Sequence, residues 1–275
     1  MVRSLLAKAV LYDIMKEKRE ATVMVVKQDV LYPHCGEYRR LHIYLPPEYE
    51  TSEERYPVMY FFDGHNLYSD EDATYGKSWG LRDFLDTWGK GMIVVGLECS
   101  HTGNQRLWEY LPYAPETERF GELKSWGEET LRWIVEDIKP MIDLCFRTIP
   151  FRECTGIGGS SMGGLMALRA AVGWNRWFSK AACVSSAIGF CPTGVLKDAA
   201  ETVIDPDTRV YLSWGEKESH IHEGRDLSRE RNEAVSALLR QQGAATMCYR
   251  QPGGGHCEAD WEKLVPDFMD FLWMR

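Results

Sequence analysis

The sequence predicts a mostly parallel α/β sheet that is covered by helices on both faces. One observation behind this prediction is a set of short, nearly continuous apolar runs, of which residues 57–64 (PVMYFFDG) and 91–99 (GMIVVGLEC) are the clearest. Runs of this length, closed by turn residues, are typical of strands buried on both faces. The other observation is that the later strands alternate with helical segments, which indicates crossover connections between parallel strands.

The predicted elements follow one another in a regular order. An early strand covers residues 40–49 (RLHIYLPPEY), whose apolar residues alternate before two prolines. After the two apolar runs, further strands are expected at 153–159, 180–187, 208–215 and within 245–255. Helices are expected at 128–144, from the spacing of its apolar residues, and at about 164–172, 227–243 and 258–274.

Nothing in the sequence divides the chain, because it holds no repeat, low-complexity tract or linker. We therefore expect a single domain over residues 1–275. Residues 1–20 are expected to form a leader segment and not a signal peptide, because Lys8 interrupts their apolar stretch and Asp13 closes it. Residues 65–127, rich in Tyr, Trp, Gly and charge, are expected to form long loops, in part, over one edge of the sheet.

The charge and the cysteine content of the chain indicate which partners and which cellular compartment to expect. The chain has 32 basic and 41 acidic residues, a net charge of -9, which argues against nucleic-acid or anionic-membrane partners. No apolar run approaches the ~20 residues that span a bilayer. The eight cysteines are scattered without a C-x-x-C pair, a pattern that favours buried free thiols in a reducing, cytoplasmic compartment.

A candidate nucleophile stands at the turn after the predicted strand 153–159. The pattern G-x-S-x-G, which a sharp strand-to-helix turn requires around a reactive serine, is met by Gly159 to Gly163 with Ser161 at its centre. Centred on Ser160 the pattern would need glycine at the position of Met162. Ser161 is therefore the candidate nucleophile. A tight turn that packs a helix against a strand is the alternative that this motif leaves open.

Three histidines follow this serine, at positions 220, 222 and 256. In this topology the catalytic base lies on a loop after the last strand. His256 meets this condition, because it follows three glycines and precedes the predicted final helix. His220 and His222, with Glu218 and Glu223 nearby, could instead be metal ligands. No further Cys/His cluster stands at a suitable spacing, so we expect a solvated loop there and no metal.

The acid that orients the histidine should follow the strand between the serine and the histidine. Residues 208–215 form that strand, and Glu216 and Glu218 come directly after it. Glu218 is our first choice and Glu216 our second. Asp226 is third, because it lies close to the following helix.

These stretches resemble the Putative esterase family of α/β-hydrolases, which includes esterase D, feruloyl esterases and enterochelin esterases. The resemblance runs from about residue 40 to the C-terminus and is carried by four segments: PVMYFFDGHNLY (57–68), GIGGSSMGGLMAL (156–168), VYLSWGEKES (210–219) and GGGHCEADW (253–261). It implies an α/β-hydrolase fold with Glu218 in the acid position. It also implies an oxyanion hole made by the backbone N–H groups of Met162 and His65.

The substrate-facing residues are expected in the loops above the carboxyl end of the sheet. Arg106, Trp108 and Tyr110 stand in one such loop, and they could form an aromatic cleft with a cation for an acidic substrate group. The alternative is that the aromatic rings fill the core and that Arg106 pairs with Glu109.

Together these residues predict a serine esterase that works through a Ser-His-Glu triad and an acyl-enzyme, without metal or nucleotide cofactor. A small-molecule or saccharide-linked ester as substrate, and a homo-oligomer, are compatible with the sequence. Acyl transfer or peptide cleavage by the same triad is one alternative. A non-catalytic binding protein on a hydrolase fold is the other.

Overall fold

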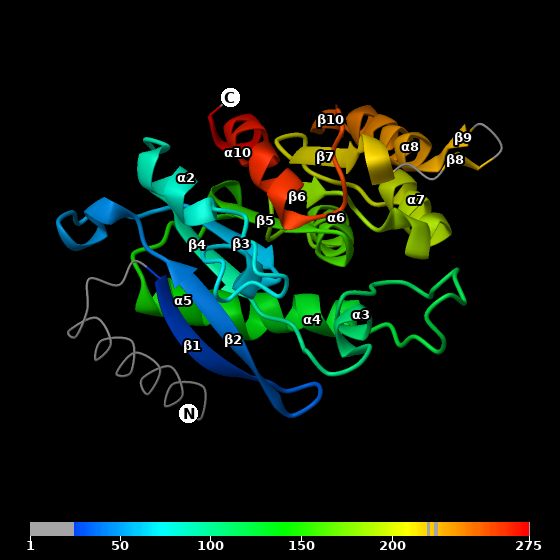
Figure 1. Ribbon diagram of the computed structural model, residues 1–275. Helices are drawn as coiled ribbons and strands as arrows, with labels where there is room; N and C mark the ends of the chain where they lie inside the picture. Colours follow the sequence, from blue (N-terminus) through cyan, green and yellow to red (C-terminus); the bar gives the residue numbers. More distant parts are fainter. Residues whose placement is uncertain (1–24, 219–220, 223–224, 275) are drawn as a thin grey trace.

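The computed structural model describes residues 25–218, 221–222 and 225–274. Its centre is an eight-stranded sheet in the order β1-β2-β4-β3-β5-β6-β7-β10 (Figure 1). These strands are β1 (Val25–Tyr32), β2 (Glu37–Tyr44), β3 (Val58–Phe62), β4 (Ile93–Leu97), β5 (Thr155–Ser160), β6 (Lys180–Val184), β7 (Arg209–Gly215) and β10 (Ala245–Gln251). A separate ribbon pairs β8 (Ile221–His222) with β9 (Arg225–Asp226).

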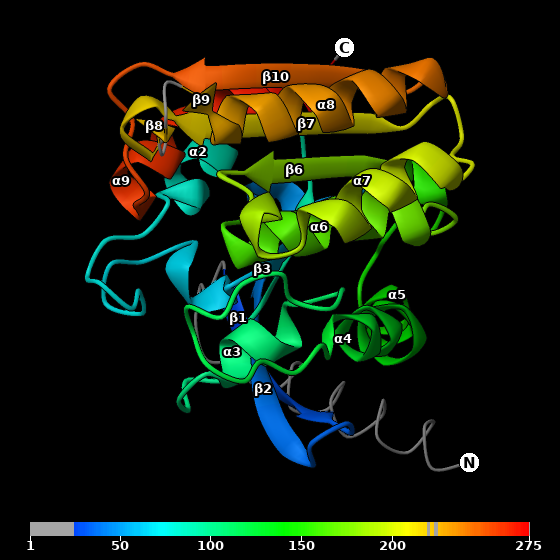
Figure 2. The same ribbon diagram turned by 90° about the vertical axis from the view of Figure 1, so that its right-hand side faces the viewer.

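The pairing of the strands confirms the predicted, mostly parallel sheet. From β4 to β10 each neighbouring pair in the sheet is parallel, whereas β2 runs antiparallel to both β1 and β4. The carboxyl ends of the parallel strands therefore meet at one edge of the sheet. Figure 2 shows β6 and β10 pointing toward this edge, where α9 (Glu258–Trp261) lies.

Helices cover both faces of the sheet. One face packs against α4 (Gly127–Trp133), a π turn (Ile134–Ile138), α5 (Lys139–Cys145), α6 (Met162–Gly173), α7 (Pro192–Glu201) and α8 (Leu227–Gln241). The other packs against α2 (Leu81–Thr87), α9 and α10 (Val265–Trp273). The short α3 (Gln105–Glu109) lies in the segment that follows β4.

Strand β3 explains why the apolar runs of the sequence are continuous. All five of its side chains are buried. Val58, Tyr60 and Phe62 belong to the core under α4 to α8, and Met59 and Phe61 belong to the core under α2 and α10. Successive side chains point to opposite faces of a strand, so a sheet with two covered faces needs apolar residues at every position.

Most predicted elements are present with shifted ends. The helix predicted at 128–144 is interrupted by the π turn, and the final helix is divided into α9, a 3₁₀ turn (Glu262–Leu264) and α10, which has a proline in its first turn. Strand β1 and helix α7 were not predicted. Residues 65–127 contain α2, β4 and α3 as well as loops, and the leader segment at 1–20 lies outside the described residues.

Within the described ranges, no helix has both the length and the apolar content that a membrane crossing requires.

The core under α10 provides a test of this arrangement. Phe268 is fully buried between the rings of Phe61, Trp79 and Tyr211. Phe268→Ala should lower the free energy of unfolding by about 3–5 kcal/mol, because the cavity it leaves cannot close completely. The control Phe151→Ala, at a residue that is 67% exposed, should change it by less than about 0.5 kcal/mol. Urea unfolding of both variants measures the difference, and equal losses would contradict the assigned core.

Candidate active site

Ser161 occupies a strained backbone conformation between β5 and α6. Its φ of 56° and ψ of -120° lie outside the regions that most side chains adopt. Three backbone hydrogen bonds hold it there: its N–H donates to Val184 over 2.9 Å, and its carbonyl accepts from Leu165 at 3.0 Å and Ala187 at 2.9 Å. The turn therefore presents the Ser161 side chain at the carboxyl edge of the sheet, ahead of the helix N-terminus. Ser160, the last residue of β5, is buried.

The glycines at either side of this serine are required by close backbone contacts. A Cβ atom on Gly159 would lie 2.7 Å from the backbone of Gly163. A Cβ atom on Gly163 would lie 2.8 Å from Cβ of Phe62 in β3. Any larger residue at these two positions would push α6 away from the sheet, which explains the spacing of the motif.

The carboxylate of Glu218 lies against the ring of His256. His256 Nδ1 and Glu218 Oε2 are 2.8 Å apart. The other carboxylate oxygen, Oε1, accepts from Ser185 Oγ at 2.8 Å and from the N–H of Gly215 at 3.0 Å. A carboxylate with three donors has a fixed orientation, so it can hold the imidazole in one position and one tautomer.

Trp261 contacts both His256 and Ser185, the serine that donates to Glu218. Trp261 in α9 stands edge-on to the ring of His256, with ring centroids 5.0 Å apart. Its Nε1 donates to Ser185 Oγ over 2.9 Å, and this hydroxyl in turn donates to Glu218. Ser185 and Trp261 therefore help to hold Glu218 and His256 in place, and these contacts were not predicted from the sequence. The available signal was the segment GGGHCEADW, which carries part of the family resemblance and ends at Trp261.

The other two acids considered for the triad have different partners. Glu216 accepts from the N–H of Gly253 at 2.8 Å and pairs with Arg250 at 3.2 Å. Asp226 caps α8, accepting from the N–H of Arg229 at 3.1 Å. His220 and Glu223, named in the metal alternative, lie outside the described residues.

The loop after β3 is anchored by an ion pair between the buried carboxylate of Asp63 and the partly exposed side chain of Arg106. Asp63, with φ 57° and ψ 50°, accepts from Nε and Nη2 of Arg106, each over 2.7 Å. Burial alone would raise the pKa of Asp63, but the charge and hydrogen bonds of Arg106 lower it, so the carboxylate stays ionised. This pair fixes the start of the turn Gly64–Asn66, in which His65 lies.

Arg106 and Tyr110 thus support the loop after β3. Arg106 does not pair with Glu109, which bonds to Arg39 instead. Tyr110 is 2% exposed, and its hydroxyl accepts from the N–H of Asp63 at 3.2 Å. Trp108 packs against Trp126 with Lys124 over its ring, away from the residues that line the cavity described next. Only Arg106 of the three expected substrate contacts reaches that cavity, and its guanidinium is already paired.

A cavity of about 680 Å³ opens beside Ser161. Ser161 and His256 both line it, as do residues of the segments 63–75, 99–106 and 256–261. Glu258 lies in its wall and accepts from Asn66 Nδ2 at 3.3 Å. Burial and the nearby charge of Asp63 raise the pKa of Glu258. The contact joins the loop after β3 to the loop that carries His256.

The oxyanion hole named above would use the backbone N–H groups of Met162 and His65. Among the residues that the structure describes, no carbonyl or side chain accepts from the N–H of Met162 or of His65. Met162 begins α6, where the helix dipole also favours negative charge. Both residues remain predictions for this role.

Within the described ranges, one group could hold a metal ion: His65, Glu98 and His101, whose ligand atoms lie within 4.8 Å of one another. Burial opposes ionisation of Glu98, but hydrogen bonds from His42 and His101 lower its pKa to about 2. Burial lowers the pKa of His65 despite the neighbouring charge of Asp63. This group was not predicted from the sequence.

Comparison with known proteins agrees with the segments noted in the sequence. A family model described as Putative esterase matches residues 33–271. The uncharacterized protein YbbA of Bacillus subtilis (strain 168) is 26% identical over 195 residues, 68% of this chain and 72% of that protein. An esterase of Mycobacterium tuberculosis (strain H37Rv) is 31% identical over 141 residues, which cover 51% of this chain but only 27% of that protein.

Solved structures share the fold. An IroE-like serine hydrolase from Shewanella oneidensis has a TM-score of 0.70 at 17% identity, and the match covers 89% of this chain and 78% of that one. At this identity the likeness concerns the fold alone, and it confirms the predicted α/β-hydrolase architecture.

A substitution of Arg106 tests whether this residue anchors the loop after β3 or binds substrate. Arg106→Leu leaves the Asp63 carboxylate buried without its cation, so the free energy of unfolding should fall by about 3 kcal/mol or more. The matched control Arg40→Leu removes a pair in which both side chains are about half exposed, and should cost less than about 1 kcal/mol. Urea unfolding measures both. If Arg106→Leu instead raised KM for an acidic ester with no loss of stability, Arg106 would be a substrate contact and not an anchor.

Proposed function

The chain belongs to the Putative esterase family, and from that premise we propose that it hydrolyses carboxylic esters through a triad of Ser161, His256 and Glu218. Membership of the family makes the protein a carboxylic ester hydrolase. The triad and the steps assigned to it below are our proposal.

One observation carries the assignment of the residues. His256, which is hydrogen-bonded to Glu218, lines the same cavity as Ser161 in its strained turn. Because Nδ1 of His256 faces the carboxylate, its other ring nitrogen, Nε2, is left for the serine hydroxyl and the substrate. A serine, an imidazole and an orienting acid are the three parts that nucleophilic catalysis by an alcohol requires.

In the first half of the proposed reaction, Ser161 Oγ attacks the ester carbonyl carbon while Nε2 of His256 takes the hydroxyl proton. The carbonyl oxygen becomes an oxyanion that accepts hydrogen bonds from the N–H groups of Met162 and His65. Each such donor lowers the barrier by roughly 3–4 kcal/mol in related chemistry. The intermediate then expels the alcohol, which receives the proton from His256, and leaves an acyl group on Ser161.

In the second half, His256 takes a proton from water, and the resulting hydroxide attacks the acyl carbon. Collapse of this intermediate releases the carboxylic acid and returns the proton to Ser161. Glu218 stabilises the imidazolium that forms in both halves. The chemistry consumes one water and needs no redox partner.

The substrate in this proposal is a small-molecule or saccharide-linked ester. A cavity of about 680 Å³ accommodates a molecule of that size, with the aromatic Tyr75 and Trp261 in its wall. Membership of the Putative esterase family favours ester hydrolysis over acyl transfer or peptide cleavage. All three proposed triad residues are present, which favours catalysis over a purely binding role. The cytoplasmic location and the homo-oligomer remain predictions of the sequence.

The adjacent serines provide a matched test of the nucleophile. Ser161→Ala should reduce kcat for p-nitrophenyl ester hydrolysis by about 10⁶-fold, the loss seen when a serine hydrolase is left without its nucleophile. Ser160→Ala, one residue away and buried at the end of β5, should keep activity close to that of the native protein. Activity that survives Ser161→Ala would refute the assignment, and so would an equal loss in both variants.

The two glutamates after β7 test the acid in the same way. Glu218→Gln preserves the shape of the side chain but removes the negative charge beside His256, and kcat should fall by about 10⁴-fold. Glu216→Gln removes a surface pair with Arg250 and should leave kcat nearly unchanged. Steady-state rates over a range of pH compare the two. A larger loss in Glu216→Gln would transfer the role to that residue.

A further inference from the structure

We propose that His65, Glu98 and His101 form a binding site for a divalent transition-metal ion such as Zn²⁺, at the wall of the cavity and separate from the triad. Two histidines and one carboxylate are a common protein ligand set for zinc, with a fourth position left open.

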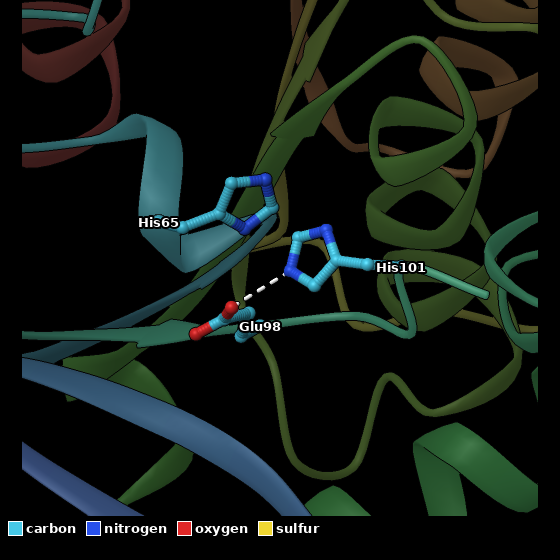
Figure 3. A group of neighbouring side chains, drawn as sticks. All are labelled: His65, Glu98 and His101. Atoms are coloured by element: carbon cyan, nitrogen blue, oxygen red, sulfur yellow. Dashed lines mark hydrogen bonds and ion pairs between the residues drawn. The ribbon is translucent and has the colours of Figure 1, made fainter. Parts of the chain in front are cut away.

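The three side chains converge from different parts of the chain. His65 comes from the turn after β3, and Glu98 and His101 come from the segment after β4. Figure 3 shows the two rings and the carboxylate facing a common point, with His101 Nε2 2.7 Å from Glu98 Oε1. Tetrahedral zinc with bonds of about 2.0–2.1 Å separates its ligand atoms by roughly 3.3 Å. The group spans separations from 2.7 Å to at most 4.8 Å, so small rotations of side chains bring it to that geometry.

The strongest sign of a missing partner is the ring of His65. The residue is 5% exposed, and its Nδ1 is buried without any hydrogen-bond partner among the described residues. Its other nitrogen, Nε2, lies 2.9 Å from Thr74 Oγ1. When Nε2 donates its proton to that hydroxyl, Nδ1 carries a lone pair, and Figure 3 shows Nδ1 directed toward Glu98 and His101. A buried nitrogen lone pair without a donor is costly, and a metal ion would satisfy it.

The carboxylate is held by a second contact that leaves one oxygen for the ion. Glu98 Oε2 lies 3.0 Å from Nε2 of His42, a side chain that is itself almost fully buried. Hydrogen bonds of this kind to a ligand fix its orientation and strengthen metal sites. Glu98 Oε1 now accepts from His101. On metal binding this hydrogen bond is replaced by coordination, with the proton of His101 moved from Nε2 to Nδ1 through solvent.

The site faces the cavity. His65 and His101 line its wall, and the side chain of His101 is 55% exposed, so an ion has a path of entry and an open coordination position toward the cavity. The ion would join the turn that carries His65 to the segment after β4. It would therefore fix the backbone N–H that we propose for the oxyanion hole.

The test is a zinc titration of the whole protein, after treatment with a chelator, in competition with a chromophoric chelator. Loss of a contact to a metal ligand weakens binding by about 10–100-fold, so loss of a ligand itself should cost at least about 100-fold. We expect that loss in both His101→Gln and Glu98→Gln. The matched control His34→Gln, at an exposed histidine of the β1–β2 turn, should bind zinc as the native protein does.

Cobalt substitution identifies the ligands independently of activity. Co²⁺ in the proposed site should give the visible absorption of a tetrahedral ion with nitrogen and oxygen ligands, without a sulfur charge-transfer band, and His101→Gln should abolish it. Equal zinc affinity in His101→Gln, Glu98→Gln and His34→Gln would overturn the proposal. So would a cobalt spectrum with a sulfur band that is lost in Cys257→Ser, because the metal would then lie beside His256.

Discussion

The proposed active site, at the carboxyl edge of the sheet, depends on three turns whose backbone conformation is unfavourable for most residues other than glycine. Among the described residues, the non-glycine positions with positive φ are Asp63, Ser161 and Ser185, at 57°, 56° and 47°. Each directly follows a parallel strand, β3, β5 and β6 respectively. Such conformations cost of order 1–3 kcal/mol each and persist only where the surroundings fix them. The neighbouring strands fix Ser161 and Ser185, whose N–H groups donate to Val184 in β6 and Ser213 in β7. Asp63 is fixed by Arg106 and Tyr110, which belong to the segment after β4.

Charge and hydrogen bonds connect two of these turns, those of Asp63 and Ser185, to other residues of the proposed site. Asp63 and its partner Arg106 hold the turn beside the proposed oxyanion site, and Ser185 donates to the acid that holds His256. The carboxylates differ in environment: Arg106 lowers the pKa of Asp63 against the effect of burial, whereas burial and the charge of Asp63 raise that of Glu258. Two carboxylates at one edge of the sheet therefore have pKa values shifted in opposite directions.

The sequence was enough to predict the sheet and the residues proposed for the triad, because each has a local signal. Gly159 and Gly163 mark the elbow through sterics, and His256 and Glu218 are placed by their distance from a strand end. Contacts across the fold have no such signal. Arg106 meets Asp63 from 43 residues away, and nothing in its surroundings distinguishes it from a surface cation or a substrate contact. The buried Nδ1 of His65 likewise depends on the packing of two loops.

The segment after β4 holds none of the proposed triad residues, but it positions other parts of the proposed site. It supplies Arg106, which fixes Asp63, and also Glu98 and His101, which face the ring of His65. The turn 63–66 is therefore held from both ends by one segment, through an ion pair at Asp63 and through the proposed metal group at His65. The proposed nucleophile, Ser161, is positioned by strands β5 and β6, and the proposed base, His256, by Glu218. The position of the His65 N–H, the proposed oxyanion donor, depends instead on the segment after β4, so changes in this segment should alter stabilisation of the transition state without displacing the proposed triad.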